Sequence, residues 1–141
     1  MTLSNPLIFA HRGASFDYPE MSREAYLAAV EQGADGFETD LRLTKDLVIV
    51  CWHDASMKRV ADRDLVIAES TFAEIRAAYP VLALTELLDI AVENKKHLAL
   101  ETKHPVPTHG AIVPSEGGWI SLLGAWGGNL PHLAVLEFHR T

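Results

Sequence analysis

The shortest connection between two predicted strands limits the folds open to this chain more than any other feature. Residues 36–43 alternate apolar and polar side chains, as a half-buried strand does, and residues 47–52 form a second β-rich run. Only residues 44–46 separate the two, whereas a parallel return needs a crossover of about a dozen residues. The two runs must therefore form an antiparallel hairpin. The hairpin brings His53 and Asp54 back toward the polar side chains of the first strand.

A strand–helix–strand unit is predicted at the start of the chain. The apolar run at residues 6–10 is typical of a buried strand. Ser22 can cap a helix that extends to about Gln32, and Gly33 can end it in a left-handed conformation. Together with residues 36–43 these elements make a βαβ unit, whose two strands are parallel neighbours.

Downstream of the hairpin the pattern predicts a loop, two helices and a third parallel strand. In order, they are a loop at 57–69, a short helix opened by a capping box at Thr71–Glu74 and ended by Pro80, a helix capped by Thr85 that runs through Asn94, and a strand at His97–Lys103. Beyond Pro105, repeated prolines and glycines interrupt every pattern except a short strand at 134–138.

Composition and charge narrow the function classes. A formal net charge of −7 over 141 residues argues against a nucleic-acid-binding surface, and it suits a protein that gathers carboxylates around a cation. Cys51 is the single cysteine, so an intrachain disulfide is excluded and a reducing compartment is favoured. The N-terminus does not resemble a signal peptide, and no apolar run is long enough to span a bilayer. We expect a soluble, cytoplasmic protein without stable membrane insertion.

Charged side chains end each predicted parallel strand. Functional residues in α/β folds gather at the carboxyl ends of strands. Glu38 and Asp40 project to the same side of their strand and repel each other unless a cation lies between them. Glu101 on a neighbouring strand would complete an oxygen site suited to Ca²⁺ or Mg²⁺. Alternatively, Glu38 and Asp40 form the solvated face of an edge strand, but the position of Glu101 favours the metal site.

Two histidines and two cationic side chains accompany these carboxylates. A single histidine is more often structural, but His11 and His53 both lie at strand ends and converge on the cluster. A neutral imidazole can take a proton from an attacking hydroxyl, and an imidazolium can give one to a leaving alkoxide. Arg12 and Lys103 supply positive charge for a phosphoryl group, Arg12 through its two-pronged guanidinium. This combination predicts phosphodiester cleavage.

Six motifs in this order resemble the glycerophosphodiester phosphodiesterase family. They are His11-Arg12-Gly13, Pro19-Glu20, Glu38-x-Asp40, Leu43-Thr44-Lys45-Asp46, His53-Asp54 and Glu101-Thr102-Lys103. The resemblance implies a (β/α)₈ barrel and a metal-dependent hydrolase of lipid and glycerol metabolism, which splits a small-molecule glycerophosphodiester into an alcohol and glycerol 3-phosphate. It implies the following roles: His11 and His53 as the acid/base pair, Glu38, Asp40 and Glu101 as metal ligands, Arg12 and Lys103 as phosphate contacts, and Glu20 in the site wall.

The chain departs from the family pattern in two residues and in length. Met21 stands where the family usually has asparagine, and Leu47 where it usually has glycine. The resemblance runs from about Pro6 to Pro105, so we expect residues 1–105 to be the N-terminal part of such a domain. Residues 106–141 form an irregular tail, as a truncated or frameshifted reading frame would give. Because a complete barrel takes about 250 residues, we expect an incomplete barrel with about three parallel strands plus the hairpin.

Other functions remain open at this point. The chain could be a non-catalytic truncated product that binds at most a metal or a partner, and its open strand edges favour self-association. A phosphatidylinositol-type phospholipase shares the fold and the acid/base chemistry, but the three carboxylates favour the metal-dependent diesterase. A metal-independent lyase would leave those carboxylates unexplained. We expect little or no hydrolysis by these 141 residues alone.

Overall fold

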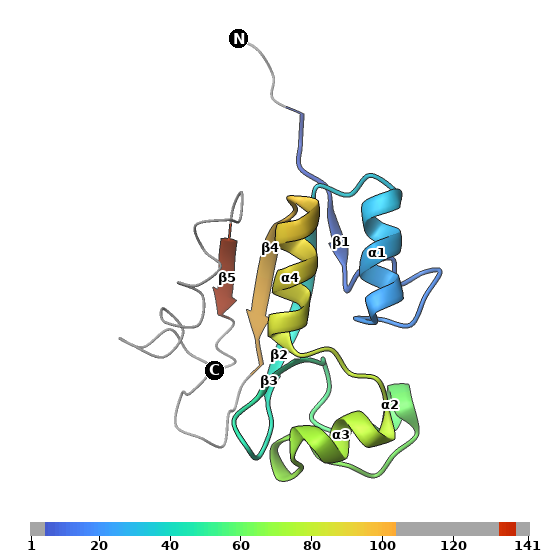
Figure 1. Ribbon diagram of the computed structural model, residues 1–141, viewed down its shortest axis with the longest axis vertical. Helices are drawn as coiled ribbons and strands as arrows, with labels where there is room; N and C mark the ends of the chain where they lie inside the picture. Colours follow the sequence, from blue (N-terminus) through green and yellow to red (C-terminus); the bar gives the residue numbers. More distant parts are fainter. Residues whose placement is uncertain (1–4, 104–132, 138–141) are drawn as a thin grey trace.

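The parallel strands lie side by side in the order in which the chain forms them (Figure 1). The computed structural model describes residues 5–103 and 133–137. Its strands are β1 (Phe9–His11), β2 (Gly36–Leu43), β3 (Ile49–Cys51), β4 (His97–Thr102) and β5 (Leu133–Glu137). The sheet order is β1-β2-β4-β5, all parallel, and β3 pairs antiparallel with β2. A parallel sheet whose order never reverses winds in one direction, as the wall of a (β/α)₈ barrel does.

The hairpin, the βαβ unit and the short C-terminal strand are therefore confirmed, and the described sheet has four parallel strands where about three were expected. Among the described residues no strand covers the outer edge of β1 or of β5. This strand order confirms the predicted α/β class and the predicted incomplete barrel. The sheet is open at both edges in the part of the chain that the structure describes.

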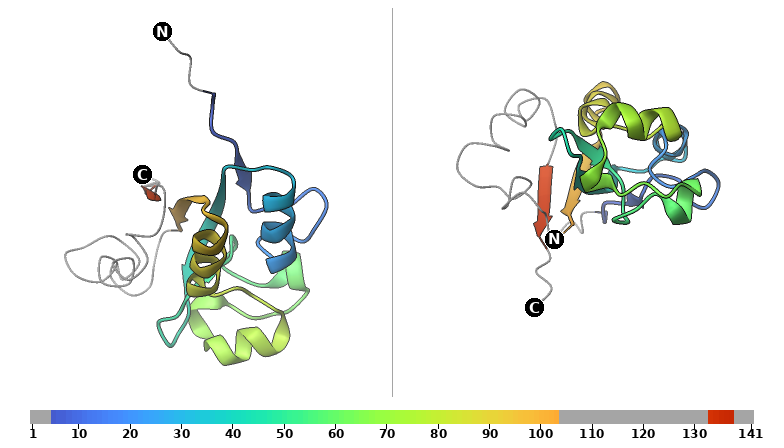
Figure 2. Two further views of the ribbon diagram at one scale, coloured as in Figure 1. Left: turned by 45° about the horizontal axis from the view of Figure 1, so that its top comes forward. Right: turned by 90° about the horizontal axis from the view of Figure 1, so that it is seen from below.

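Helices cover one face of this sheet and one end of it. They are α1 (Arg23–Glu31), α2 (Lys58–Ala61), the 3₁₀ turn η1 (Ile67–Glu69), α3 (Phe72–Ala78) and α4 (Leu84–Asn94). The two longer helices, α1 and α4, pack side by side against one face, and α2 and α3 lie beyond the strand ends to which the arrows point (Figures 1 and 2). The opposite face of the sheet is left for polar side chains.

Local hydrogen bonds explain why the helices begin and end where they do. The Ala25 N–H donates to the Ser22 hydroxyl at 3.1 Å, so Ser22 is the N-cap of α1 as predicted. Thr71 and Glu74 form the expected reciprocal capping box of α3. Gly33 follows the end of α1 with a φ of +84°. These three predictions rest on interactions within one turn, and all three are confirmed.

Helix α4 begins two residues earlier than the cap at Thr85 implied, because its N-cap is Ala83. The Ala83 N–H donates to the Glu86 carboxylate at 3.1 Å, and Leu84 is the first helical residue. Leu84 is fully buried in the core, and this packing favours an earlier helix start than the polar residue Thr85 suggested. Thr85 is therefore not the N-cap.

Two further expectations are corrected by tertiary packing. The apolar run at 6–10 is not a buried strand: β1 starts at Phe9, and Leu7 and Ile8 are 55% and 63% exposed, because β1 has a described neighbour on one edge alone. Residues 57–69 are not only a loop, since they contain α2 and η1. Met57 and Ile67 are buried in a second apolar cluster with Trp52 and Ile75, and this burial orders the segment.

The alternation of β2 sorts its side chains between the two faces of the sheet. The apolar residues of β2 lie in one core cluster with the inner faces of α1 and α4; among them are Phe37, Leu41, Leu43, Tyr26, Leu87 and Leu88. The Tyr26 and Phe37 rings pack with their centroids 5.2 Å apart. Because successive side chains of a strand alternate, Glu38 and Asp40 project to the face that α1 and α4 do not cover.

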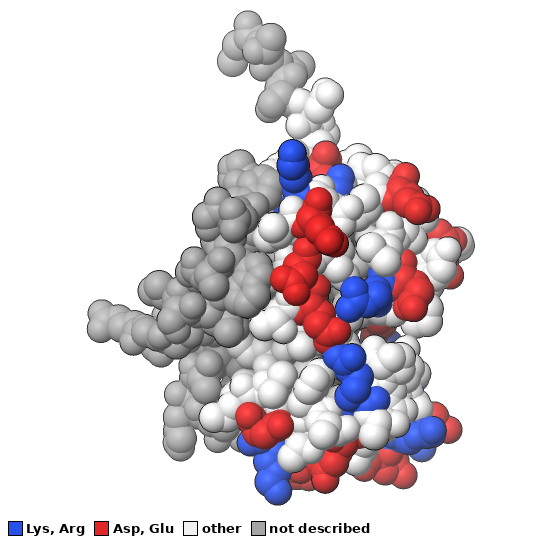
Figure 3. Space-filling view, in the orientation of Figure 1, with Lys and Arg blue, Asp and Glu red and all other residues white. Residues whose placement is uncertain are grey.

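Surface charge agrees with the acidic composition. On the face shown in Figure 3, acidic and basic side chains are interspersed and form no broad basic patch. Within the described part of the chain, no helix is both long and apolar enough to cross a membrane.

Two glycines with left-handed backbones provide a matched test of how β1 is joined to α1. Gly13 has a φ of +77°, and a Cβ there would lie 2.8 Å from the Ala25 carbonyl carbon. Gly33 has a φ of +84°, but a Cβ there would have no atom within 4 Å. We predict that Gly33→Ala costs about 1–3 kcal/mol of unfolding free energy through backbone strain alone. Gly13→Ala should cost clearly more, because helix α1 must also move.

Urea unfolding of the two variants measures the difference. Equal losses of stability would show that the close approach between residue 13 and α1 does not exist in solution.

Candidate active site

Strand register places the predicted site residues next to one another on the polar face of the sheet. In the pairing of β1 with β2, His11 lies opposite Glu38. In the pairing of β2 with β4, Asp40 lies opposite Glu101. Side chains of directly paired residues project to the same face, so residues from three strands converge. Lys103 follows β4, and its backbone N–H donates to the Leu41 carbonyl at 3.2 Å, which continues the pairing.

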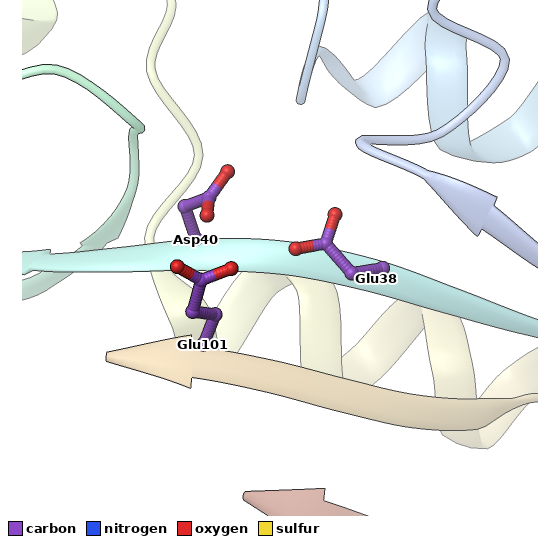
Figure 4. A group of neighbouring side chains, drawn as sticks. All are labelled: Glu38, Asp40 and Glu101. Atoms are coloured by element: carbon purple, nitrogen blue, oxygen red, sulfur yellow. The ribbon is translucent and has the colours of Figure 1, made fainter. Parts of the chain in front are cut away.

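The three carboxylates form a compact cluster (Figure 4). Glu38, Asp40 and Glu101 each offer an oxygen, and these oxygens lie within 4.8 Å of one another. Asp40 is 1% exposed, and the other two are partly buried. Burial, and then repulsion from Asp40, raise the pKa of Glu38 to about 7. A cation bound to the cluster would favour the charged form of Glu38.

Two basic side chains partly neutralise the cluster. Arg12 Nε lies 3.1 Å from Asp40 Oδ2, and Lys103 Nζ lies 3.0 Å from Asp40 Oδ1. Lys103 also bonds Glu101. Among the described residues, however, Asp40 Oδ2 accepts no hydrogen bond although it is buried. Arg12 Nε lies beside this oxygen but does not donate a hydrogen bond to it. Three carboxylates thus face two cationic side chains, and an all-oxygen donor set with this excess of negative charge fits a divalent cation.

A tight turn after β1 directs Arg12 to this cluster. Arg12 has a φ of +59°, and its backbone N–H donates to the Glu38 carbonyl at 3.1 Å. The same N–H approaches Glu38 Oε2 at 3.2 Å. His11 ends β1, with its side chain 69% exposed and its Nε2 3.7 Å from Glu38 Oε2. His11 therefore lies at the open side of the cluster, where a solvent-borne substrate would reach it.

The hairpin brings His53 to the edge of β2 along which β1 and Arg12 also lie. The Trp52 N–H donates to the Asp40 carbonyl at 3.0 Å, and Arg42 Nε donates to the His53 carbonyl at 2.9 Å. The ring itself contacts Asp54, with His53 Nδ1 2.7 Å from Asp54 Oδ1. A proton on Nδ1 that is shared with Asp54 leaves Nε2 free for acid/base chemistry.

Arg59, for which the sequence predicted no role, connects Asp54 with Glu20. Arg59 on α2 donates from Nε to Asp54 Oδ2 at 2.7 Å and from Nη2 to Glu20 Oε1 at 2.5 Å. Glu20 Oε2 accepts from Arg12 Nη1 at 2.8 Å. Hydrogen bonds from Arg59 and then from His53 lower the pKa of Asp54 to about 2. No spacing rule links Arg59 to Glu20, which lies 39 residues away, because this contact forms only once α2 has packed beside the second apolar cluster.

An open cavity of about 620 Å³ adjoins this group of residues. His11, Arg12, Glu20 and Arg59 line it, and two tyrosines, Tyr18 and Tyr79, complete its walls. A cavity of this size and mixed lining has room for a small polar molecule beside His11 and Arg12, which in turn contact Glu38 and Asp40.

Comparison with known proteins matches this chain to one family. The model of the glycerophosphoryl diester phosphodiesterase family matches residues 11–129. The match continues past Pro105, where the motif resemblance ended, so it includes much of the segment assigned to the irregular tail.

Curated relatives carry the same activity in their names. A probable glycerophosphodiester phosphodiesterase 1 of Mycobacterium tuberculosis is 32% identical over 142 residues, which cover 87% of this chain and 51% of the relative. A glycerophosphodiester phosphodiesterase of Bacillus altitudinis is 38% identical over 118 residues, covering 74% and 48%. The chain spans about half the length of these curated relatives.

Solved structures of phosphodiesterases share the fold of this chain. A phosphodiesterase of Oleispira antarctica, in complex with the product sn-glycerol-3-phosphate, has a TM-score of 0.79 at 26% identity and covers 95% of this chain and 58% of its own. A glycerophosphodiester phosphodiesterase of Thermotoga maritima has a TM-score of 0.69 at 26% identity, covering 92% and 62%.

The ion pair between Asp54 and Arg59 makes a pH-dependent contribution to stability. Because the folded-state pKa of Asp54 lies near 2, below its ordinary value of 3.8, the contribution is complete above pH 4 and is lost as the pH falls through 2. We therefore predict that Asp54→Asn lowers the unfolding free energy at pH 7 and that the gap to the unmodified protein narrows toward pH 2.

Urea unfolding at pH 7, 5, 3 and 2 checks this. Asp64→Asn is the control, because the Asp64 side chain is 91% exposed and its ion pair with Lys58 spans 3.6 Å. A gap for Asp54→Asn that stays constant from pH 5 to pH 2 would exclude the ion pair as its source.

Proposed function

Because this chain belongs to the glycerophosphoryl diester phosphodiesterase family, we propose that its site hydrolyses glycerophosphodiesters to an alcohol and glycerol 3-phosphate. The observation that carries the proposal is the convergence of three carboxylates with Arg12, Lys103 and His11 on one face of the sheet. The Oleispira antarctica structure, which holds sn-glycerol-3-phosphate as product, supports the product class. The cavity beside His11 and Arg12 has the size for such a substrate.

In the proposed reaction the two histidines exchange protons with the reacting oxygens. One histidine, neutral, accepts a proton from the attacking water as the water oxygen bonds to phosphorus. The P–O bond to the alcohol breaks, its electron pair stays on the alcohol oxygen, and the other histidine, protonated, supplies the proton. The net reaction adds one water to the diester. His53 suits such a role because Asp54 engages Nδ1 and leaves Nε2 open.

Arg12 and Lys103 are proposed to bind the phosphoryl group. Both already lie beside Asp40, at 3.1 and 3.0 Å, and a guanidinium can bind two phosphoryl oxygens at once. Glu20 is proposed to act from the wall of the site, where its hydrogen bond to Arg12 Nη1 restricts the guanidinium. Because the guanidinium is already held in place, less conformational entropy is lost when it binds an anion.

We further infer that Glu38, Asp40 and Glu101 hold a divalent cation, Ca²⁺ or Mg²⁺. An all-oxygen donor set suits hard cations of this kind. When bound, the ion would withdraw electron density from the phosphoryl oxygens and offset the negative charge of the transition state.

Domain organisation, location and association remain part of the proposal. We propose that residues 1–105 form the N-terminal part of the barrel domain, and the family match to residue 129 supports assigning part of the following segment to the same domain. A cytoplasmic location is supported by Cys51, which is buried and whose pKa burial raises to about 12, as expected for a structural thiol. Self-association is supported by the outer edge of β1, beside which Leu7 and Ile8 are exposed.

Cation binding gives the first test. We predict that calorimetric titration with Ca²⁺ or Mg²⁺ shows one site, and that Glu38→Gln weakens it at least about tenfold by removing a charged ligand. Glu93→Gln, an exposed change on α4, should bind as the unmodified protein does. Equal affinity of the Glu38 and Glu93 variants would remove Glu38 from the site.

Hydrolysis gives the second test. A barrel-complete protein can be made by joining residues 5–103 to the part of the Oleispira antarctica phosphodiesterase that follows the residue matched to Lys103. In it, His11→Ala and His53→Ala should each lower turnover of glycerophosphocholine by more than about a hundredfold, while cation affinity persists. Arg12→Lys should also lower turnover, because an ammonium cannot bind phosphate with two prongs.

Release of glycerol 3-phosphate is the measurement, with and without the cation. The 141-residue chain alone should turn over well below about one per second, because an open sheet holds the site residues less rigidly than a closed barrel. Full activity of either histidine variant would exclude that residue from the proton transfers.

A further inference from the structure

We propose that Arg59 is a positioning residue that ties His53 to Arg12 by binding Asp54 and Glu20 with one guanidinium. This inference rests on the proposed function, since it gives Arg59 a task in orienting the acid/base and phosphate-binding groups of that site. Its support is the geometry of one continuous chain of hydrogen bonds and ion pairs.

On one side Arg59 fixes the carboxylate that holds the His53 ring. Arg59 Nε lies 2.7 Å from Asp54 Oδ2, and Arg59 Nη2 lies 3.3 Å from Asp54 Oδ1. This two-pronged contact sets the plane of the carboxylate. Asp54 Oδ1 also contacts His53 Nδ1 at 2.7 Å, so the orientation of the carboxylate determines that of the ring.

On the other side the same guanidinium reaches the phosphate-binding arginine through Glu20. Arg59 Nη2 lies 2.5 Å from Glu20 Oε1, and Arg12 Nη1 lies 2.8 Å from Glu20 Oε2. Arg12 in turn faces Asp40 at 3.1 Å. The chain runs from the His53 ring through five charged side chains whose signs alternate, so neighbouring members attract each other; these five are Asp54, Arg59, Glu20, Arg12 and Asp40.

The backbone positions explain why a side-chain tie is needed. His53 follows β3 and Glu20 follows β1, and these two segments attach to β2 separately, at the carbonyls of Asp40 and Glu38. Arg59 lies on α2, and Met57, the residue before this helix, is fully buried. The Met57 N–H also donates to the Leu65 carbonyl at 2.8 Å. Arg59 therefore projects from an anchored segment toward both strand ends.

A purely structural role makes different predictions. The Arg59 side chain is 51% exposed, so solvent weakens its ion pairs and their contribution to stability is modest. If charge alone mattered, lysine would replace arginine. If the two-pronged contact matters, lysine fails, because an ammonium is a single point of attachment.

Nitrogen-15 NMR of the 141-residue protein tests the proposal without requiring hydrolysis. With the rings neutral, His53 should be predominantly protonated on Nδ1, and the Arg12 Nε–H should be shielded from solvent. In Arg59→Gln and Arg59→Lys the tautomer ratio of His53 should shift at least about threefold toward an even mixture, and the Arg12 Nε–H should exchange at least about threefold faster.

Lys58→Gln is the matched control, since Lys58 precedes Arg59 on α2 and pairs with Asp62 and Asp64 instead. It should change neither signal. Retained dispersion of the amide spectrum shows folding, and Arg59→Lys serves if Arg59→Gln does not fold. An unchanged His53 tautomer, an unchanged Arg12 exchange rate, or Arg59→Lys behaving as the unmodified protein would each overturn the proposal. A shift in both signals together with an inactive barrel-complete protein would instead sustain the positioning role and remove the proposed function.

Discussion

The pairing of β2 with a parallel strand on each side is the interaction on which the candidate site depends. It sets Glu38 opposite His11 and Asp40 opposite Glu101, so three strands contribute to one face. The packing of the other face against α1 and α4 keeps this register, because a shift of one residue would exchange the apolar and charged faces of β2. Burying Phe37 and its neighbours thus positions the charged residues.

Electrostatics then decides how these charged residues can coexist. Burial of Asp40 is costly unless positive charge is near, and Arg12 and Lys103 supply it at 3.1 and 3.0 Å. Glu38 retains a raised pKa of about 7, because burial and Asp40 together disfavour its charged form. The carboxylate cluster therefore retains unfavourable electrostatic energy, which the proposed divalent cation would offset. The same two cations are proposed to receive the phosphoryl group, so their ion pairs with the cluster also keep them oriented.

The described sheet has the strand order of a barrel wall, but its two outer strands each have one described neighbour. Strand order without reversal suits a barrel, in which each strand has two neighbours. Among the described residues β1 has one neighbour, and the apolar side chains at its start are exposed as a result. The site residues nevertheless converge, because they come from β2 and from the strands beside it. The described strands thus bring the candidate site residues together, although they do not close a barrel.

Features governed by neighbouring residues could be predicted from the sequence alone. The caps at Ser22 and Thr71 need only one helical turn, and the hairpin follows from the length of residues 44–46. Alternation placed Glu38 and Asp40 on one face, and strand ends predicted that Glu101 would join them.

Features governed by contacts between distant segments could not be predicted in this way. The start of α4 at Leu84, the exposure of Leu7 and the order within residues 57–69 all depend on what each segment packs against. The contact of Arg59 with Glu20 is of the same kind, because Glu20 lies 39 residues away along the chain. The sequence by itself determined the hairpin, the caps at Ser22 and Thr71 and the chemical types gathered at the strand ends, since these depend on local periodicity and connection length. Only the tertiary structure decided which charges meet, because a guanidinium and a carboxylate pair through space, and no local pattern records that distance.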